Sequence, residues 1–178
     1  MLFRGRQPAA SVWRRFRAGA DEFTFAQVAQ HYEARVATNA ERAVDLLHVL
    51  AEQMPPAVDV YVEDARTGRA WRGTDAALPD VREAVARLKV PLAAYGGVEF
   101  AVYSPDDQLT LTTELALYAY GRTDRWLYVL QGKGLVETTT PEPETYELSP
   151  DELGEAPDLA EALDAAADRL GLEPVGGR

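Results

Sequence analysis

The chain contains no cysteine, only two histidines and no long apolar run, and each absence excludes a class of protein. Without cysteine there can be no disulfide, zinc–thiolate site, iron–sulfur cluster or thiol nucleophile, which fits a reducing compartment. No apolar stretch approaches the roughly 18–20 residues that cross a bilayer, and the N-terminus lacks the apolar segment of a secretory signal. The sequence therefore predicts a cytoplasmic protein with no membrane span.

Charge is unevenly distributed along the 178 residues, which carry 18 basic and 29 acidic side chains and a formal net charge of −11. Residues 135–178 hold twelve acids against two arginines. A net negative body repels phosphate, so nucleic acid is disfavoured as a partner. Residues 1–20 hold no acid and form a basic arm that we expect to dock on the acidic body. Its arginines are Arg4, Arg6, Arg14, Arg15 and Arg17.

An arm of this composition is also typical of a mitochondrial transit peptide, which stays open as an alternative. Hydrophobic residues make up 47% of the chain, which is the mix of an ordinary globular domain. We therefore divide the chain into the basic arm at 1–20, an α+β domain at 21–140, and an acidic Pro/Glu linker with a C-terminal helix at 141–178.

The strongest helical periodicity begins at Thr24. Apolar residues recur every three or four positions from there to Met54, and Pro55 and Pro56 end the run. The pattern predicts one long helix over 24–54. Thr24 and Gln27 have the spacing of a capping box at the start of this helix. Thr38 and Glu41 repeat that spacing, which leaves a break in the helix near Asn39 as an alternative.

Shorter elements follow. Alternating valines at 58–62, the turn Arg66-Thr67-Gly68 and residues 69–72 predict a hairpin. Pro79 opens a predicted helix that ends before Pro91, and Pro157 opens a last helix that ends at Gly171.

Residues 98–131 contain three alternating runs separated by the turn segments 104–107 and 121–124, a pattern that predicts an antiparallel meander. One face of this meander would be the core. It carries Phe100, Val102, Leu109, Leu111, Leu115, Leu117, Trp126, Tyr128 and Leu130. The other face would carry a second apolar set: Ala116, Tyr118, Tyr120, Leu127 and Val129.

The expected fold class is α+β, with an antiparallel sheet of about five strands packed with helices in the order α-β-β-α-β-β-β-α. This order is similar to that of the roadblock and longin group of small α+β interaction domains. The similarity is one of element order over residues 24–170. It implies a five-stranded sheet between helices and frequent pairing into dimers.

Residue types that carry chemistry form no recognisable site. Asp45 and His48 have a spacing similar to the Glu-x-x-His pattern of di-metal bundles, but no second expected helix carries a histidine. We therefore expect this stripe to be solvated surface. None of the three serines lies in a G-x-S-x-G elbow. The sequence predicts no catalytic residue, no metal ligand and no cofactor.

These observations favour a non-enzymatic interaction or scaffold module over an enzyme. The second apolar face predicts self-association as a homodimer, or binding of another protein, through Tyr118, Tyr120, Leu127 and Val129. The alternative is a small-ligand-binding protein or an enzyme whose pocket cannot be recognised from residue spacing.

Overall fold

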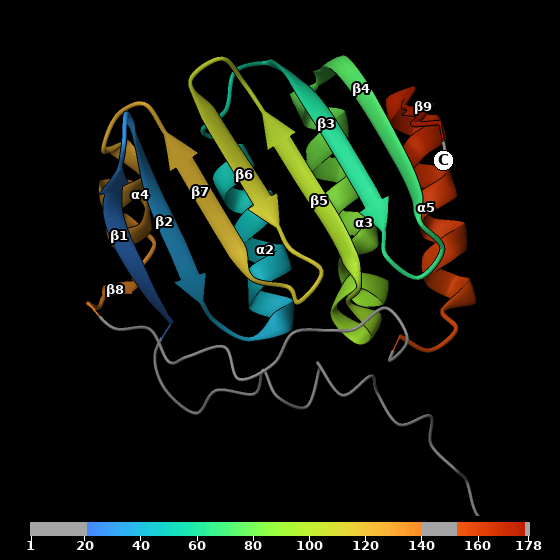
Figure 1. Ribbon diagram of the computed structural model, residues 1–178, viewed down its shortest axis with the longest axis horizontal. Coiled ribbons are helices and arrows are strands. Elements are labelled where there is room, and N and C mark those ends of the chain that lie inside the picture. Colours follow the sequence, from blue (N-terminus) through green and yellow to red (C-terminus); the bar gives the residue numbers. More distant parts are fainter. Residues whose placement is uncertain (1–20, 140–152, 177–178) are drawn as a thin grey trace, which may run out of the picture.

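In the computed structural model, a nine-stranded sheet forms one layer and four helices form the other, within the described residues 21–139 and 153–176 (Figure 1). The basic arm lies outside these residues. The strands are β1 (Glu22–Val28), β2 (His31–Ala37), β3 (Ala57–Asp64), β4 (Arg69–Ala77), β5 (Val98–Tyr103), β6 (Asp107–Leu111), β7 (Leu117–Gly121), β8 (Val136–Glu137) and β9 (Glu173–Pro174). The helices are α2 (Ala40–Ala51), α3 (Leu78–Tyr95), α4 (Arg125–Gly132) and α5 (Pro157–Leu170).

The strand order across the sheet is β8-β1-β2-β7-β6-β5-β3-β4-β9. All neighbouring strands are antiparallel except β1 and β8. The register places one buried residue from each of six successive strands in a single row that faces the helices. This row is Phe23, Val36, Leu117, Leu111, Phe100 and Val62.

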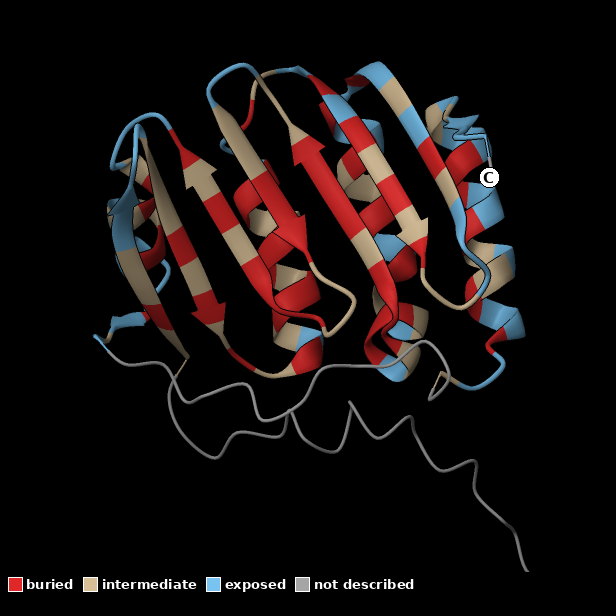
Figure 2. Cartoon of the chain, in the orientation of Figure 1, coloured by how far each residue is buried: buried red, intermediate tan, exposed pale blue. Residues whose placement is uncertain are grey.

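The helices cover one face of the sheet, and the core lies between the two layers (Figure 1). Leu47, Leu50, Leu88 and Leu92 are among its fully buried side chains. Successive side chains of a strand point to opposite faces, so buried residues alternate with half-buried or exposed ones along β3 and with half-buried ones along β7 (Figure 2). The half-buried set lies on the face that the four helices leave uncovered.

The long helix predicted at 24–54 is wrong for its first half, which forms the hairpin of β1 and β2. The break near Asn39 is confirmed, because α2 begins at Ala40. Phe25 and Tyr32 satisfied the helical period, but in the hairpin they stack on one another with ring centroids 5.6 Å apart. Aromatic and β-branched residues fit a pleated surface well, and strand pairing overrides the helical spacing here.

The third strand of the predicted meander, at 126–131, is also wrong. The third strand is β7, and the chain after Asp124 forms α4. Trp126 and Leu130 are four positions apart, a spacing that suits both a strand face and a helix face. The exposure of Tyr128 distinguishes the two. In a strand Tyr128 would share the buried face of Trp126 and Leu130, but its side chain is 62% exposed while those of Trp126 and Leu130 are fully buried.

Other predicted elements are present. The hairpin of β3 and β4 turns at Gly68, whose φ of 67° suits glycine, and α5 ends at Gly171 with φ 60°. The predicted helix end before Pro91 is wrong, because α3 continues through Pro91 to Tyr95, with Leu88 and Leu92 buried on either side of the proline. The α+β class is thus confirmed. The five-stranded sheet, the predicted element order and the similarity to roadblock domains that depended on this order are not.

A two-residue strand lies at each border of the sheet in the described part of the chain. The strand β8 pairs in parallel with Glu22 and Phe23 of β1. At the other border β9 pairs with Trp71 and Arg72 of β4 and contributes Pro174, which has no backbone N–H.

Candidate functional site: the open face of the sheet

We call the uncovered side of the sheet the open face. The strand register gives its central residues in three rows. The first row is Arg35, Tyr118, Thr110, Ala101 and Tyr61; the second is Glu33, Tyr120, Gln108, Tyr103 and Asp59; the third includes Glu99 and Glu63. No described helix packs on this side of the sheet (Figure 1).

Aromatic rings form the middle of the open face. The rings of Tyr118 and Tyr120 stack with centroids 6.0 Å apart and an interplanar angle of 9°. His31 lies 6.0 Å from Tyr120, and the guanidinium of Arg35 lies 6.0 Å from the centre of the Tyr118 ring. A cation over a tyrosine ring is attracted by the negative face of the ring. The surface therefore already holds one arginine on an aromatic side chain.

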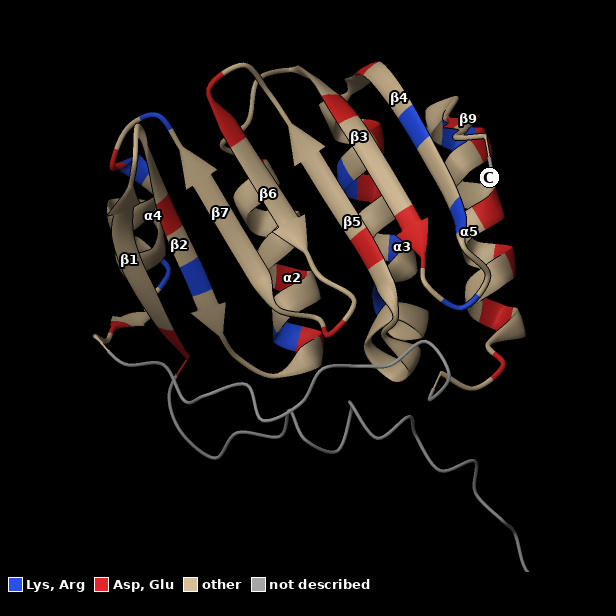
Figure 3. Ribbon diagram, viewed as in Figure 1, with Lys and Arg blue, Asp and Glu red and all other residues tan. Residues whose placement is uncertain are grey.

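Carboxylates occupy the end of the open face on β3 and β5. Glu63 and Glu99 are directly opposite each other in the register, and their strands show adjacent red bands in Figure 3. Like charges directly opposite on a sheet destabilise it. Burial raises the pKa of Glu99, and the negative charges of Glu63 and Glu114 raise it further. In the described residues no lysine or arginine forms a salt bridge with Glu63 or Glu99.

Tyr61, Tyr103 and Tyr120 of this face have raised pKa values and stay protonated at neutral pH. The hydroxyl of Tyr61 donates to Oε2 of Glu63 at 2.5 Å, and this bond, together with burial, raises the pKa of Tyr61 to about 12. Burial, with a smaller effect of Glu33, raises the pKa of Tyr120 to about 12, and burial also raises the pKa of Tyr103. The face thus combines neutral hydroxyl donors with negative carboxylates.

The like-charge pair leads to a stability prediction. Replacing Glu99 with glutamine should raise the free energy of unfolding at pH 7 by roughly 0.5–1 kcal/mol, because it removes a charge that is disfavoured by burial and repelled by Glu63. The folded-state pKa of Glu99 is raised, so the penalty is absent below the ordinary glutamate pKa of about 4.3 and develops as pH rises through the folded-state value. Urea unfolding at pH 7 and pH 4 should show the gain only at pH 7.

Glu161→Gln on α5, an exposed position, is the matched control and should give no comparable gain. An equal gain from E99Q at both pH values would contradict a charge-based penalty.

The predicted interface residues do not lie together. Tyr118 and Tyr120 are on the open face, whereas Leu127 and Val129 belong to α4 and pack against the core from the helix side. Ala116 is buried, at 5% exposure. The sheet therefore does not present the continuous apolar patch expected from a third strand. Whether these residues contact a partner stays a prediction, and the arginines of the arm lie outside the described residues.

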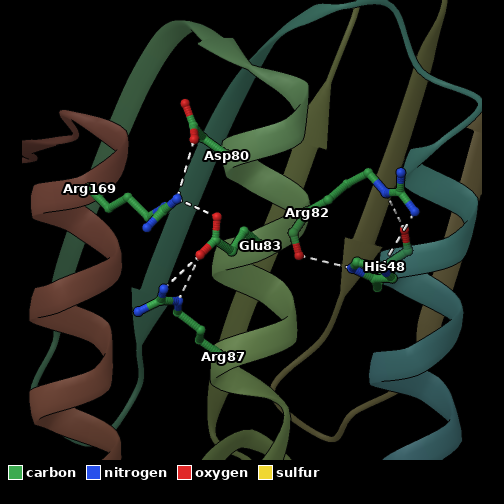
Figure 4. A network of polar contacts seen from close by, with 6 residues as sticks. All are labelled: His48, Asp80, Arg82, Glu83, Arg87 and Arg169. Atoms are coloured by element: carbon green, nitrogen blue, oxygen red, sulfur yellow. Dashed lines mark hydrogen bonds and ion pairs between the residues drawn. The ribbon is translucent and has the colours of Figure 1, made fainter.

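The acidic stripe on α2 is not the solvated surface that we expected, because it contacts α3. Asp45 pairs with Nζ of Lys89 at 2.8 Å. Nδ1 of His48 donates to the carbonyl oxygen of Arg82 at 2.9 Å, and Nε of Arg82 donates to the carbonyl oxygen of His48 at 3.2 Å (Figure 4). Among the described residues no group of three or more histidine, aspartate or glutamate side chains could hold a metal ion.

A second network joins α3 to α5. Arg169 of α5 contacts Asp80 and Glu83, and Glu83 also accepts from Arg87 at 2.6 Å (Figure 4). On the far border Arg69 pairs with Asp164 at 2.6 Å. Asp45, Asp80, Glu83 and Asp164 on the helix side thus each have a cationic partner, in contrast to the carboxylates at the end of the open face.

One buried cation was missed by sequence reasoning. The side chain of Arg66, in the turn between β3 and β4, is 8% exposed. It donates to the carbonyl oxygens of Gly96 and Tyr95, both at 2.6 Å, and to that of Gly154 at 3.0 Å. Burial lowers the pKa of Arg66. These contacts satisfy the carboxyl end of α3, so the role of Arg66 is structural.

Within the described ranges no helix is both long and apolar enough to cross a membrane. A cytoplasmic location stays a prediction. The comparisons with known proteins found no matching family model, no matching curated protein and no matching solved structure. The function therefore has to be argued from the chain's own surface.

Proposed function

We propose that the protein is a non-enzymatic interaction module whose open face binds a cationic segment of a partner protein. The observation that carries the proposal is the Glu63–Glu99 pair beside a row of tyrosines. A folded domain gains no stability from two opposed carboxylates. Such a local conflict is typical of a site that is kept for binding.

The chemistry of this face suits arginine-bearing segments. Carboxylates accept bidentate hydrogen bonds from guanidinium groups, and tyrosine rings stack on them. The contact of Arg35 with the ring of Tyr118 is an example within the chain itself. A cation bound between Glu63 and Glu99 would also remove their mutual repulsion. Binding would therefore be favoured both by the new contacts and by the loss of that repulsion.

Pairing of two open faces in a homodimer is the less favourable arrangement. In a two-fold dimer the same patch faces itself, so carboxylates of one copy meet carboxylates of the other. Across the sheet from β2 to β4, the paired residues of the three central rows include two arginines, Arg35 and, opposite Tyr61, Arg72. They also include four carboxylates: Glu33, Asp59, Glu63 and Glu99. Charge complementarity therefore favours a basic partner over a second acidic face.

A titration with a defined probe tests the proposal. We would use full-length ¹⁵N-labelled protein in which all five arm arginines are replaced by glutamine, here called the glutamine-arm variant, so that the arm cannot compete. Capped hexa-arginine should shift the amide signals of β3, β5 and β7, and capped hexa-glutamate should not. Adding Glu63→Gln and Glu99→Gln should weaken hexa-arginine binding about tenfold, which corresponds to about 1.4 kcal/mol.

The matched control removes the same charge elsewhere. Glu161→Gln with Asp168→Asn changes two exposed acids of α5, on the helix side of the molecule. If this control weakens binding as much as the open-face pair, or if hexa-arginine shifts α5 signals instead, attraction is non-specific and the proposal is wrong.

A further inference from the structure

We infer that the chain's own basic arm, residues 1–20, occupies the open face of the same molecule, and that a basic partner must displace it. The inference rests on the proposed function and names the first occupant of that surface. Three features carry it: the point where the arm joins the sheet, the length of the arm, and the pair of carboxylates at that end of the open face.

The junction between arm and sheet is fixed at the acidic end of the open face. Asp21 accepts from Thr38 and pairs with Nε of Arg42 at 3.1 Å, and its carbonyl oxygen accepts from Val136 N at 3.0 Å. The register shows which end this is. Glu22 lies one position beyond the buried row at Phe23, and Glu99 and Glu63 lie one position beyond the same row at Phe100 and Val62. The arm therefore leaves the sheet at the end where the carboxylate pair lies.

The arm is long enough to reach this pair. Between β1 and β5 there are four strand spacings, and to β3 there are five, which at about 4.8 Å each give about 19 Å and 24 Å. Arg14 precedes Asp21 by seven residues, which span about 23 Å when extended at about 3.3 Å per residue. Arg14 and Arg15 thus come within reach of Glu99 and Glu63, and the remaining arm residues extend past them.

Charge complementarity selects the open face over the helix side. The arm carries five arginines and no acid, while Glu63 and Glu99 face each other without a salt bridge to any described cation. Several acids of the helix side have cationic partners, such as Lys89 for Asp45 and Arg69 for Asp164. In addition, α5 lies at the opposite border of the sheet from β1 and on its other face (Figure 1).

Tethering makes even a weak contact effective. A segment joined to its site by a short flexible connection has an effective concentration in the millimolar range. A second copy of the protein would have to reach that concentration to compete. Binding within one molecule is therefore favoured over exchange of arms between molecules, and an external basic segment meets an occupied site.

Paramagnetic broadening locates the arm directly. The chain has no cysteine, so Ser11→Cys gives a unique attachment point for a spin label beside Arg14 and Arg15. In the full-length protein the label should broaden amide signals near Glu63, Glu99 and Tyr118. A label at Ala165→Cys, on the exposed side of α5 near β4, is the control and should leave the signal of Tyr118, four strands away on β7, sharp.

Two charge variants of the arm sharpen this test. Replacing Arg14 and Arg15 with glutamine should reduce the broadening at Glu63 and Glu99 strongly, whereas the same change at Arg4 and Arg6 should reduce it less. Broadening centred on α5, or an equal effect of both variants, would overturn the placement. Broadening that appears only when spin-labelled unenriched protein is mixed with ¹⁵N-labelled protein would show exchange between molecules and would also overturn it.

Competition separates this inference from the proposed function. Hexa-arginine should bind the glutamine-arm variant about tenfold more tightly than it binds the unmodified protein, because the competent state of the latter is only fractionally populated. Equal affinity at the open face for both proteins would leave the proposed function standing and refute arm occupancy. Failure of hexa-arginine to reach the open face of the glutamine-arm variant would refute the proposed function itself.

Discussion

Replacing Trp126 with alanine should lower the free energy of unfolding by about 3–5 kcal/mol, the usual loss when a large buried aromatic side chain is truncated. Trp126 is fully buried, and its Nε1 donates to the carbonyl oxygen of Tyr120 at 3.0 Å. The guanidinium of Arg125 lies 4.6 Å from the centre of its ring. Truncation would remove the contact that holds α4 against β7. Urea unfolding followed by circular dichroism measures the loss.

Tyr128→Ala is the matched control, because Tyr128 lies on the same short helix but is 62% exposed. It should change the free energy of unfolding by less than about 0.5 kcal/mol. In the predicted third strand, residues 126 and 128 would share the core face and both substitutions would be severe. Similar large losses for the two variants would therefore contradict the helix.

Removing the Arg66 side chain is the second substitution with a large expected effect. Arg66→Ala should lower the free energy of unfolding by about 3–5 kcal/mol, since it breaks three hydrogen bonds and leaves the 6% exposed carboxylate of Asp64 without its cationic partner. It also leaves the last carbonyls of α3 without this donor. Arg66→Lys should recover only part of the loss, because a lysine ammonium cannot reproduce the planar guanidinium geometry.

Arg69, an exposed arginine in the same hairpin, is the matched control for the Arg66 substitution. Arg69 pairs with Asp164, but the two side chains are 51% and 50% exposed. Exposed ion pairs contribute about 0–1 kcal/mol, so Arg69→Ala should be mild. If thermal and urea unfolding give equal losses for Arg66→Ala and Arg69→Ala, the buried network does not stabilise the end of α3 as described.

The α+β class and several single elements could be predicted, where local turn chemistry and periodicity agree. The hairpin of β3 and β4 has Gly68 at its turn, and α5 has Pro157 at its start and Gly171 at its end. The hairpin of β1 and β2 has no such signal. Its two-residue loop is Ala29–Gln30, and Ala29 adopts a φ of 55° that is normally left to glycine, asparagine or aspartate. The pairing of β2 with β7, which is distant in the sequence, holds the hairpin in place, and the residues of the turn themselves give no sign of that pairing.

The candidate site was only partly predictable for a related reason. Alternation along β7 correctly placed Tyr118 and Tyr120 on the face away from the core. It could not bring Glu63 next to Glu99, because these residues are 36 positions apart and α3 lies between their strands. Their pairing depends on which strands become neighbours. The one local signal was the alternation along β3, which places Glu63 on the face opposite to that of buried Val60 and Val62.

The two-residue strands at the borders of the sheet bear on behaviour at high protein concentration. A long uncovered strand is a template on which a second chain can add its own backbone, and repetition of that step builds a fibril. Here the nine-residue strand β4 is followed outward by β9, whose Pro174 has no hydrogen to give to an incoming chain. Stepwise growth is therefore blocked at that position, and the molecule can carry a broad tyrosine-bearing surface without also offering that stretch of border to polymerisation.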